Sequence, residues 1–387
     1  MFQRVVLIVL DGVGVGALPD AGDYGDTGAA TLPHVAAAVG GLSLPHLAEL
    51  GLGQITSIPG LCQPEALSGY WGMLAEVSPG KDSVTGHWEL AGVILEHPFA
   101  TFPEGFPSEI ITAFTAETGL APLGNVAASG TDILRQLGEE HLVTGRPIVY
   151  TSSDSVFQIA AHEEIIPPEK LYQICRSAER ILVPYNVCRV IARPFVGTAA
   201  DNFQRTSGRH DFSRQPEHKT LLQKLQGAHI PTCGVGKIKD LFAGQGLDQS
   251  FSTKSNAEGM EKTLLALEKN KSGLVMTNLV DFDMLYGHRL DCVGFAAALT
   301  EFDGWLPQLK QSLTKDDLWI ITADHGCDPT TPGTDHTREY VPLLVWSAAL
   351  SQAGTLGVRR TFADVGATVA EVFGIDCTGR SFLPELK

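Results

Sequence analysis

The sequence lacks the features that would tie it to a membrane or to a disulfide scaffold. Its 387 residues include seven cysteines, an odd number without a Cys-x-x-Cys pair, and this usage is typical of reduced thiols in a cytoplasmic protein. No apolar run reaches the length of a membrane span, and the first run, residues 5–10, is too short for a signal peptide. We therefore expect a cytoplasmic location.

Basic residues are scarce. The chain has 28 Lys and Arg against 44 Asp and Glu, a net charge of −16. Such a surface repels anionic polymers, so we expect no nucleic-acid partner. A small phosphorylated substrate remains possible, because a few basic side chains and divalent cations can reverse the potential inside one cleft.

Two nucleotide-binding patterns are also missing. Residues 11–16 follow an apolar run but read G-x-G-x-G after the aspartate, whereas a dinucleotide fold requires G-x-G-x-x-G. Residues 80–83 and 234–238 lack the Gly-Lys-Ser/Thr run of a phosphate-binding P-loop. The glycines at positions 12, 14 and 16 have two interpretations: a simple glycine-rich turn, or a sharp bend that lets Asp11 face a cation. We favour the second.

The length exceeds the usual size of a single core, which favours about two domains. Segments rich in proline and glycine, near residues 98–107 and 214–216, bracket a stretch with strands and helices of its own. We therefore predict a core domain of residues 1–97 and 215–387 and an inserted smaller α/β cap domain of residues 98–214.

The last third of the chain alternates apolar runs of strand length with amphipathic helical stretches. This pattern predicts an α/β fold with a mostly parallel sheet flanked by helices. The expected helices cover residues 256–270, 293–313 and 362–373, and the expected strands cover residues 5–10, 273–280, 318–322 and 341–346.

Acids and histidines follow several of these strands. Ligands of open α/β sheets bind beyond the carboxyl ends of the strands, so these side chains should gather at one edge. Carboxylates and imidazoles in this number suffice for two divalent ions, and they would suit Mn²⁺, Mg²⁺ or Zn²⁺. Any one of them alone would more often be a solvated or structural residue. The predicted ligands are Asp11, Asp283, His288, Asp324, His325 and His336.

Thr85 is the candidate nucleophile. A hydroxyl attacks poorly at neutral pH, but coordination to a metal lowers its pKa and makes covalent catalysis possible. The alternative is that Ser83 or Thr85 caps the helix predicted to follow. The two interpretations are compatible, because a helix N-terminus also binds phosphate.

Taken together, these motifs resemble those of the phosphopentomutase family in the alkaline phosphatase superfamily. Thr-Gly-His-Trp-Glu and Gly-Thr-Asp-His-Thr-Arg-Glu are the most specific of them, and the resemblance runs from the first strand to the last helix, the insertion included. The motifs are Asp11 and residues 81–89, 281–289, 324–329 and 333–339.

The resemblance implies an alkaline-phosphatase-like core and an isomerase that interconverts ribose 1-phosphate, or deoxyribose 1-phosphate, with the 5-phosphate. A phosphorylated Thr85 and a sugar bisphosphate intermediate would carry the phosphate. The implied cofactors are two divalent ions, with Mn²⁺ expected, and a sugar bisphosphate activator, either ribose 1,5-bisphosphate or glucose 1,6-bisphosphate. One ion would be held by Asp11, Asp324, His325 and Thr85, and the other by Asp283, His288 and His336.

The resemblance also implies substrate contacts. Ser152 and Asp154 are candidates for the ribose hydroxyls, while arginine and lysine side chains would bind the phosphate distal to the metals. The basic candidates, together with a neighbouring histidine, are Arg193, Arg209, His210 and Lys237. For each basic residue the alternative is an ordinary surface charge.

Two other functions remain open from the sequence. The first is another activity of the same superfamily: a phosphatase, a phosphodiesterase or a cofactor-independent phosphoglycerate mutase. The second is a metal-binding protein without turnover, whose insertion serves as an interaction module. The oligomeric state is not predicted.

Overall fold

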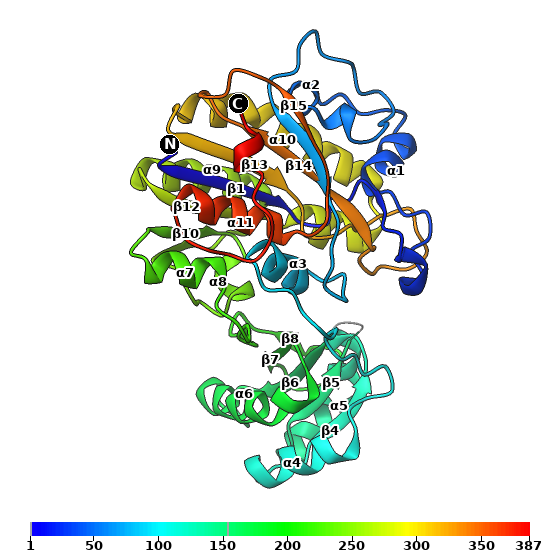
Figure 1. Ribbon diagram of the computed structural model, residues 1–387. Helices are drawn as coiled ribbons and strands as arrows, with labels where there is room; N and C mark the ends of the chain where they lie inside the picture. Colours follow the sequence, from blue (N-terminus) through cyan, green and yellow to red (C-terminus); the bar gives the residue numbers. More distant parts are fainter. Residues whose placement is uncertain (1, 153–154) are drawn as a thin grey trace. The chain divides into compact units, whose positions relative to one another are not determined.

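The computed structural model describes residues 2–152 and 155–387, and the chain divides into two compact units. The larger unit contains residues 1–97 and 216–387, and the smaller contains residues 98–215 (Figure 1). Within the described residues, no helix combines the length and the hydropathy needed to cross a bilayer. All seven cysteines are free thiols.

A mixed sheet forms the centre of the larger unit (Figure 1). Its strand order is β11-β10-β12-β1-β13-β14-β3-β15, and the run from β11 to β13 is parallel. β14 is antiparallel to both of its neighbours, and the short β2 pairs with it. The strands are β1 Arg4–Leu10, β2 Gly16–Ala17, β3 Tyr70–Leu74, β10 Thr232–Val235, β11 Gln249–Phe251, β12 Gly273–Leu279, β13 Asp317–Thr322, β14 Glu339–Trp346 and β15 Gly354–Arg359.

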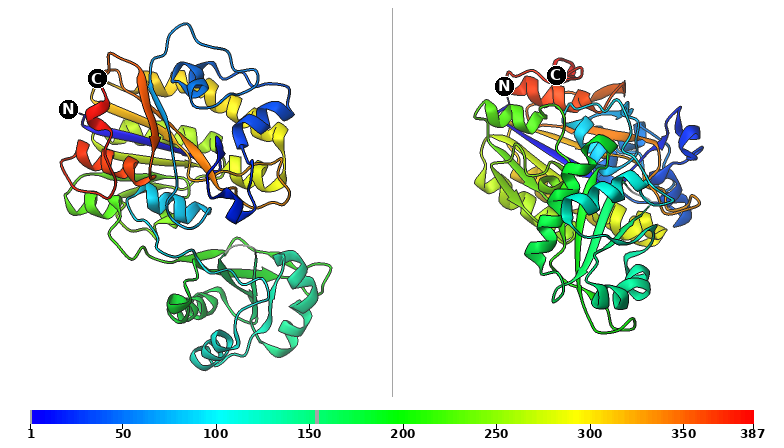
Figure 2. Two further views of the ribbon diagram at one scale, coloured as in Figure 1. Left: turned by 45° about the vertical axis from the view of Figure 1, so that its right-hand side comes forward. Right: turned by 90° about the horizontal axis from the view of Figure 1, so that it is seen from below.

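Helices cover both faces of this sheet, as Figures 1 and 2 show. α10 packs against α1, α2 and α9, whereas α11 packs against α3 and α7, and α3 against α8. Burial on both faces explains why β1, β12 and β13 are mostly apolar, and every residue in them is buried. The helices are α1 Thr31–Ala38, α2 Pro45–Glu49, α3 Ser83–Leu90, α7 Leu221–Gly227, α8 Ile238–Leu241, α9 Asn256–Lys269, α10 Cys292–Ser312 and α11 Ala363–Val372.

The register of the central strands brings their carboxyl ends to one level. Leu10 of β1 pairs with Leu279 of β12, and Val9 pairs with Thr322 of β13. The chain therefore leaves all three strands at the same edge of the sheet, and the polar residues that follow are neighbours in space.

The smaller unit is built on its own sheet, of order β4-β5-β6-β7-β8, with β9 also paired to β7. Phe106, Phe114 and Phe157 belong to a core on the face covered by α4 and α6, while α5 packs on Leu123 and Tyr150 on the other face. The elements are α4 Ser108–Thr118, β4 Leu123–Ala127, α5 Gly130–Thr144, β5 Ile148–Thr151, β6 Val156–His162, α6 Pro168–Leu182, β7 Arg189–Val196, β8 Gln204–Arg205 and β9 His210–Ser213.

The predicted fold class, a mostly parallel sheet flanked by helices with a further α/β unit, is confirmed. Helices and strands of the last third lie within two residues of their predicted bounds. The chain between Asp283 and His288 forms a single π-helical turn, Phe282–Tyr286, followed by a 3₁₀ turn, Gly287–Arg289. π turns of this kind are frequent at functional sites.

Candidate metal centre

Carboxylates and imidazoles gather where β1, β12 and β13 end. Three groups of side chains place their potential ligand atoms within 4.8 Å of one another, and His325 and Asp283 each belong to two of these groups. The described segments therefore bring all six predicted ligands into one cluster. The groups are Asp11 with Asp324 and His325, Asp283 with His325 and His336, and Asp283 with His288 and Cys327.

The first group is fully buried. His325 Nε2 lies 3.4 Å from Asp11 Oδ1 and 3.4 Å from Asp324 Oδ2. The second oxygen of each carboxylate accepts a hydrogen bond. Asn278 Nδ2 donates to Asp11 Oδ2 at 2.9 Å, and the Gly12 N–H donates to Asp324 Oδ1 at 3.1 Å. These bonds fix the carboxylates with their free oxygens turned toward the imidazole.

The second group centres on Asp283. The Nε2 atoms of His288 and His336 both lie 3.3 Å from Asp283 Oδ1. His288 Nδ1 contacts the Thr334 carbonyl at 2.6 Å, which orients the ring. The ring of His336 also lies 4.1 Å from that of His325, centroid to centroid, so the groups adjoin.

This donor set fits divalent cations. Asp283 Oδ1 and Asp324 Oδ2 are buried oxygens, each within 3.4 Å of two imidazole nitrogens. Buried carboxylate oxygens are costly unless a cation or a proton satisfies them. Burial and the Asp283 carboxylate act to raise the pKa of Asp11, yet Lys237 and His325 outweigh them and lower it to about 2. Despite its burial, Asp283 has a pKa well below the usual value, because His336 and His288 adjoin it.

Helix α3 runs directly past the first group. A Cβ on Gly86 would lie 2.0 Å from the Asp324 carbonyl oxygen, so only glycine permits this approach. Thr85, the preceding residue, is fully buried, and its hydroxyl donates to Asp82 Oδ2 at 2.5 Å. The alternative that Ser83 or Thr85 caps the helix is wrong, because Asp82 is the N-cap and accepts the N–H groups of Val84 and Thr85.

Ser83, His87 and Asn278 were not predicted as site residues. The Ser83 hydroxyl lies 3.1 Å from His325 Nε2 and donates to Asp11 Oδ1 at 3.3 Å. His87 Nδ1 lies 3.0 Å from Asp324 Oδ2. The polar side chain of Asn278, near the end of a mostly apolar strand, was a signal available in the sequence, and His87 stood in a motif already noted.

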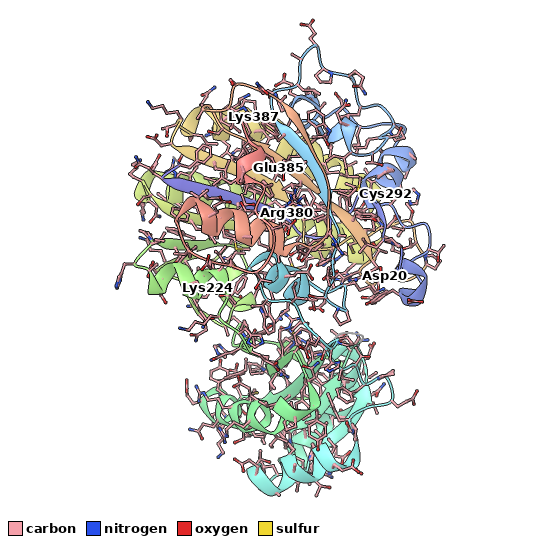
Figure 3. The ribbon with its side chains drawn as sticks, in the orientation of Figure 1. Asp20, Lys224, Cys292, Arg380, Glu385 and Lys387 are labelled. Carbon is pink, nitrogen blue, oxygen red and sulfur yellow. The ribbon has the colours of Figure 1, made fainter. Side chains whose placement is uncertain are left out.

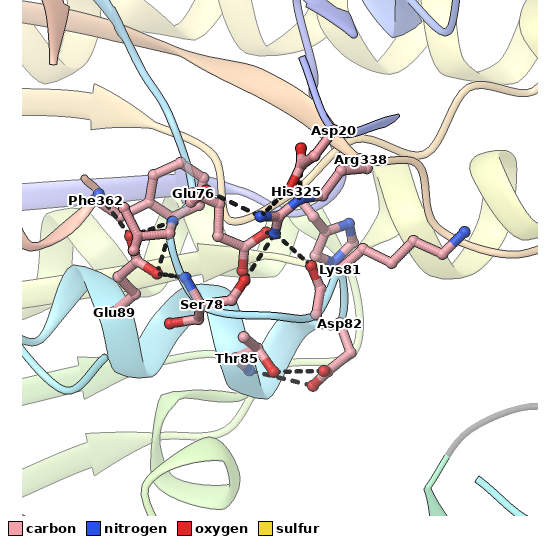
Figure 4. Close-up of polar contacts among 12 residues, drawn as sticks. Asp20, Glu76, Ser78, Lys81, Asp82, Thr85, Glu89, His325, Arg338 and Phe362 are labelled. Carbon is pink, nitrogen blue, oxygen red and sulfur yellow. Dashed lines mark hydrogen bonds and ion pairs between the residues drawn. The ribbon is translucent and has the colours of Figure 1, made fainter. Parts of the chain in front are cut away.

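Arg338 ties the segment before α3 to the rest of the site (Figure 4). This buried guanidinium pairs with Glu76 at 2.7 Å and with Asp20, also labelled in Figure 3, at 2.9 Å. It further donates to the carbonyls of Ser78 and Gly80, at 2.8 and 2.6 Å. Arg338 thereby fixes the course of the chain that leads into Thr85.

Glu89 secures the far end of the same helix. Its buried carboxylate accepts the N–H groups of Val77, Ser78 and Phe362, the second at 2.7 Å (Figure 4). Arg338 and Glu89 thus both bind the segment that precedes Thr85, residues 76–80, and Glu89 links it to the end of helix α3. The sequence motifs had suggested no role for either residue.

Of two further residues near the candidate ligands, Asp281 bonds to the start of α9, whereas Cys327 faces the ligand cluster. The Asp281 carboxylate accepts the N–H of Asn256 at 2.6 Å, and the Asp281 N–H donates to the Asn256 side-chain oxygen at 2.9 Å, at the start of α9. Cys327 belongs to one of the candidate ligand groups, with Asp283 and His288. Burial and the adjacent Asp283 raise the pKa of its thiol well above the usual value, which favours the neutral form.

The predicted substrate residues are distributed over both units. Arg193 donates to Gln158 at 3.1 Å, Arg209 binds Asp211 through two bonds of 2.7 Å, and the His210 ring packs on Tyr172 and Phe212. These residues and the half-buried Ser152 belong to the smaller unit, whereas Lys237 stands after β10 of the larger unit. Asp154 lies outside the described residues.

The chain matches a known superfamily of enzymes over almost its whole length. Residues 3–377 match the family model of the metalloenzyme superfamily, which makes the chain a member of that superfamily. A phosphoglycerate mutase of Leishmania mexicana shares the fold with a TM-score of 0.50 at 14% identity, over 97% of this chain and 96% of the other. The chain thus shares with this mutase a fold built on a mostly parallel sheet flanked by helices, as the sequence predicted.

The similar sequences belong to one family within this superfamily. The chain is 60% identical to a phosphopentomutase of Syntrophotalea carbinolica over 100% of this chain and 98% of the relative. It is 55% identical to a phosphopentomutase of Carboxydothermus hydrogenoformans over the full length of both. The chain belongs to the phosphopentomutase family.

Asp283→Asn should remove most metal binding, because Asp283 contributes to two of the three ligand groups. We expect Mn²⁺ affinity to fall by at least about 100-fold, because the change removes a ligand charge and leaves His288 and His336 without their shared carboxylate. Equilibrium dialysis with metal analysis measures this. Asp376→Asn, on the exposed surface of the same unit, controls for general loss of charge. A variant at 283 that retains wild-type metal content would contradict the proposed ligand role.

Proposed function

We propose that the protein is a phosphopentomutase that interconverts ribose 1-phosphate, or its deoxy analogue, with the 5-phosphate. Membership of the phosphopentomutase family supports an isomerase of this type. The observation that carries the mechanism is the position of Thr85 in helix α3. The next residue of the helix, Gly86, lies against the backbone carbonyl of Asp324, a candidate metal ligand. Phosphoryl transfer requires a nucleophile and cation ligands close together.

We propose two ions at the cluster, held by Asp11, Asp324 and His325 and by Asp283, His288 and His336, with Mn²⁺ the expected metal. Such ions neutralise the charge of a transferring phosphoryl group and lower the pKa of a bound hydroxyl. The residues themselves supply the positioning. Asp82 accepts the Thr85 proton in a hydrogen bond and holds Oγ1 in place, and Gly86 lets that turn of the helix approach the cluster.

The proposed reaction has two transfers. In the first, the C1 hydroxyl oxygen of ribose 5-phosphate bonds to the phosphorus of phosphorylated Thr85, the bond to Oγ1 breaks, and ribose 1,5-bisphosphate forms. In the second, Oγ1 bonds to the phosphorus at C5, the bond to the C5 oxygen breaks, and ribose 1-phosphate leaves. The threonine ends phosphorylated, so a sugar bisphosphate is needed only to prime or restore that state.

We also propose sugar phosphates as the small-molecule partners and the cytoplasm as the location. Ser152, Asp154, Arg193, Arg209, His210 and Lys237 remain proposed substrate residues. Burial raises the pKa of Asp281, and the positive charge of Lys237 opposes that effect, as it also does at Asp11, where the pKa is lowered. This supports a place for the Lys237 ammonium group near the strand ends.

The test incubates purified protein with Mn²⁺, a trace of glucose 1,6-bisphosphate and ribose 1-phosphate, and follows ribose 5-phosphate and free phosphate together. We expect isomerisation with little release of phosphate. Phosphate release without isomerisation would place the chain among the hydrolases, and turnover of 3-phosphoglycerate instead would identify a phosphoglycerate mutase. The absence of any turnover from metal-loaded protein would favour a binding protein.

A further inference from the structure

One of the three ligand groups differs from the other two because it contains sulfur. Cys327 lies with Asp283 and His288, and the potential ligand atoms of these three side chains all fall within 4.8 Å of one another. The other two groups consist of carboxylate oxygens and imidazole nitrogens. Because sulfur and oxygen donors select different cations, this thiol bears on which metal the cluster binds.

The Cys327 side chain is packed inside the cluster. The residue is 1% exposed, and its backbone N–H donates to the Thr31 hydroxyl at 3.1 Å. It stands two residues after His325, in the same segment that carries Asp324. The position of the sulfur is therefore fixed by the segment that supplies ligands to the first group.

Two glycines make room for this side chain. A Cβ on Gly287 would collide with Cys327 Sγ, and a Cβ on Gly12 would lie 2.9 Å from Cys327 Cβ. Gly287 begins the 3₁₀ turn that contains His288, and Gly12 directly follows Asp11. The thiol can thus lie against the turn that carries a candidate ligand because that turn has no side chain at position 287.

The two partners of the thiol are already oriented. His288 Nδ1 contacts the Thr334 carbonyl at 2.6 Å, so Nε2 is the nitrogen turned toward Asp283, at 3.3 Å from Oδ1. One carboxylate oxygen, one imidazole nitrogen and one sulfur are brought together in this way. Three protein ligands with a fourth position left for water are the usual arrangement around a catalytic zinc ion.

We propose that Asp283, His288 and Cys327 form a site for thiophilic divalent cations, with Zn²⁺ and Cd²⁺ as the class, and that such a cation replaces the second of the two ions proposed above. On binding, the S–H bond breaks, a metal–sulfur bond forms and the proton passes to the solvent. A hard ion such as Mn²⁺ uses the oxygen and nitrogen donors and leaves the thiol protonated. The inference shares two ligands with the proposed function and does not require the isomerase reaction.

The test titrates Cd²⁺ into full-length, Mn²⁺-loaded protein that carries Cys62→Ser and so lacks that exposed thiol. Two signals are followed: the ultraviolet charge-transfer absorption of a cadmium–thiolate bond, and the electron paramagnetic resonance of released Mn²⁺. We expect the absorption to rise as about one Mn²⁺ per chain is released, because the two cations compete for the same carboxylate and imidazole.

In this parent protein, Cys327→Ser should abolish the charge-transfer absorption. The Cd²⁺ concentration that releases half of the exchangeable Mn²⁺ should rise by about tenfold or more, because the soft ligand is lost. The affinity for Mn²⁺ should change by less than about threefold, since the hard ion does not use the sulfur. Cys292→Ser removes another thiol of the larger unit and should leave both signals unchanged.

Undiminished absorption in Cys327→Ser, or release of Mn²⁺ at the Cd²⁺ concentration of the parent, would overturn the site. An equal loss of affinity for Mn²⁺ and Cd²⁺ would also overturn it, because Cys327 would then support the cluster as a whole. These measurements do not involve turnover, so a chain that fails to isomerise can still show the site, and the reverse also holds.

A second measurement needs no substitution at position 327 and so does not depend on the folding of that variant. The parent protein is exchanged with one equivalent of Zn²⁺, freed of excess metal, and studied by X-ray absorption at the zinc edge. We expect a sulfur neighbour at about 2.3 Å from the zinc. A spectrum with only oxygen and nitrogen neighbours would contradict the proposal.

Discussion

Thr85→Ala is expected to reduce isomerisation by about 10⁴-fold or more while the protein keeps its metals, because loss of a nucleophile removes the covalent route altogether. The fold should tolerate the change. Asp82 caps α3 through the backbone N–H groups of Val84 and Thr85, and alanine retains both. Rates from a coupled assay, with metal content and circular dichroism from the same preparation, measure the effect.

Two neighbouring substitutions sharpen this result. Thr85→Ser keeps a hydroxyl at the same position and should retain a measurable part of the activity. Ser83→Ala removes the hydroxyl that contacts Asp11 and His325, and should lower activity far less than Thr85→Ala. Undiminished turnover in Thr85→Ala, or equal losses at positions 83 and 85, would refute the covalent mechanism.

Arg338→Met is expected to destabilise the larger unit by about 3–5 kcal/mol, because it leaves the Glu76 carboxylate buried without its partner. Burial already raises the pKa of Glu76 well above its usual value, and Arg338 opposes that effect. All five tryptophans belong to residues 1–97 and 216–387. Chemical denaturation followed by tryptophan fluorescence therefore reports on this unit alone.

The double variant Arg338→Met with Glu76→Gln should recover part of the lost stability, since no uncompensated charge remains at that position. Arg360→Met, at an exposed position, should change the free energy of unfolding by less than about 0.5 kcal/mol. If Arg338→Met were as stable as Arg360→Met, the ion pair between Arg338 and Glu76 would not contribute to the stability of the larger unit. Activity should fall as well, because the chain before Thr85 loses its anchor.

The strands and the ligand cluster could be predicted because one physical rule connects them. A buried parallel strand is an uninterrupted apolar run, and the polar residue at its end must lie at the edge of the sheet. Asp11, Asp283 and Asp324 were therefore found from their positions after such runs. The strand register that places them at one level confirms the rule.

Other parts of the site left no such pattern. The approach of Gly86 to Asp324, and the hold of Arg338 on the residues around Glu76, depend on contacts between segments more than 200 residues apart. The π-helical turn Phe282–Tyr286 is too short to produce a periodic pattern in the sequence.

The order of strands in the larger sheet also bears on how the protein is made. β1 lies between β12 and β13, so β1 is synthesised well before its two partners, residues 273–279 and 317–322. At about 5–20 residues per second this delay lasts roughly 13–60 s. The apolar segment Val5–Leu10 is unpaired throughout, while the uninterrupted segment of residues 98–215 can already fold. Nascent chains should therefore depend on chaperones through their first strand, and slower translation would lengthen that dependence.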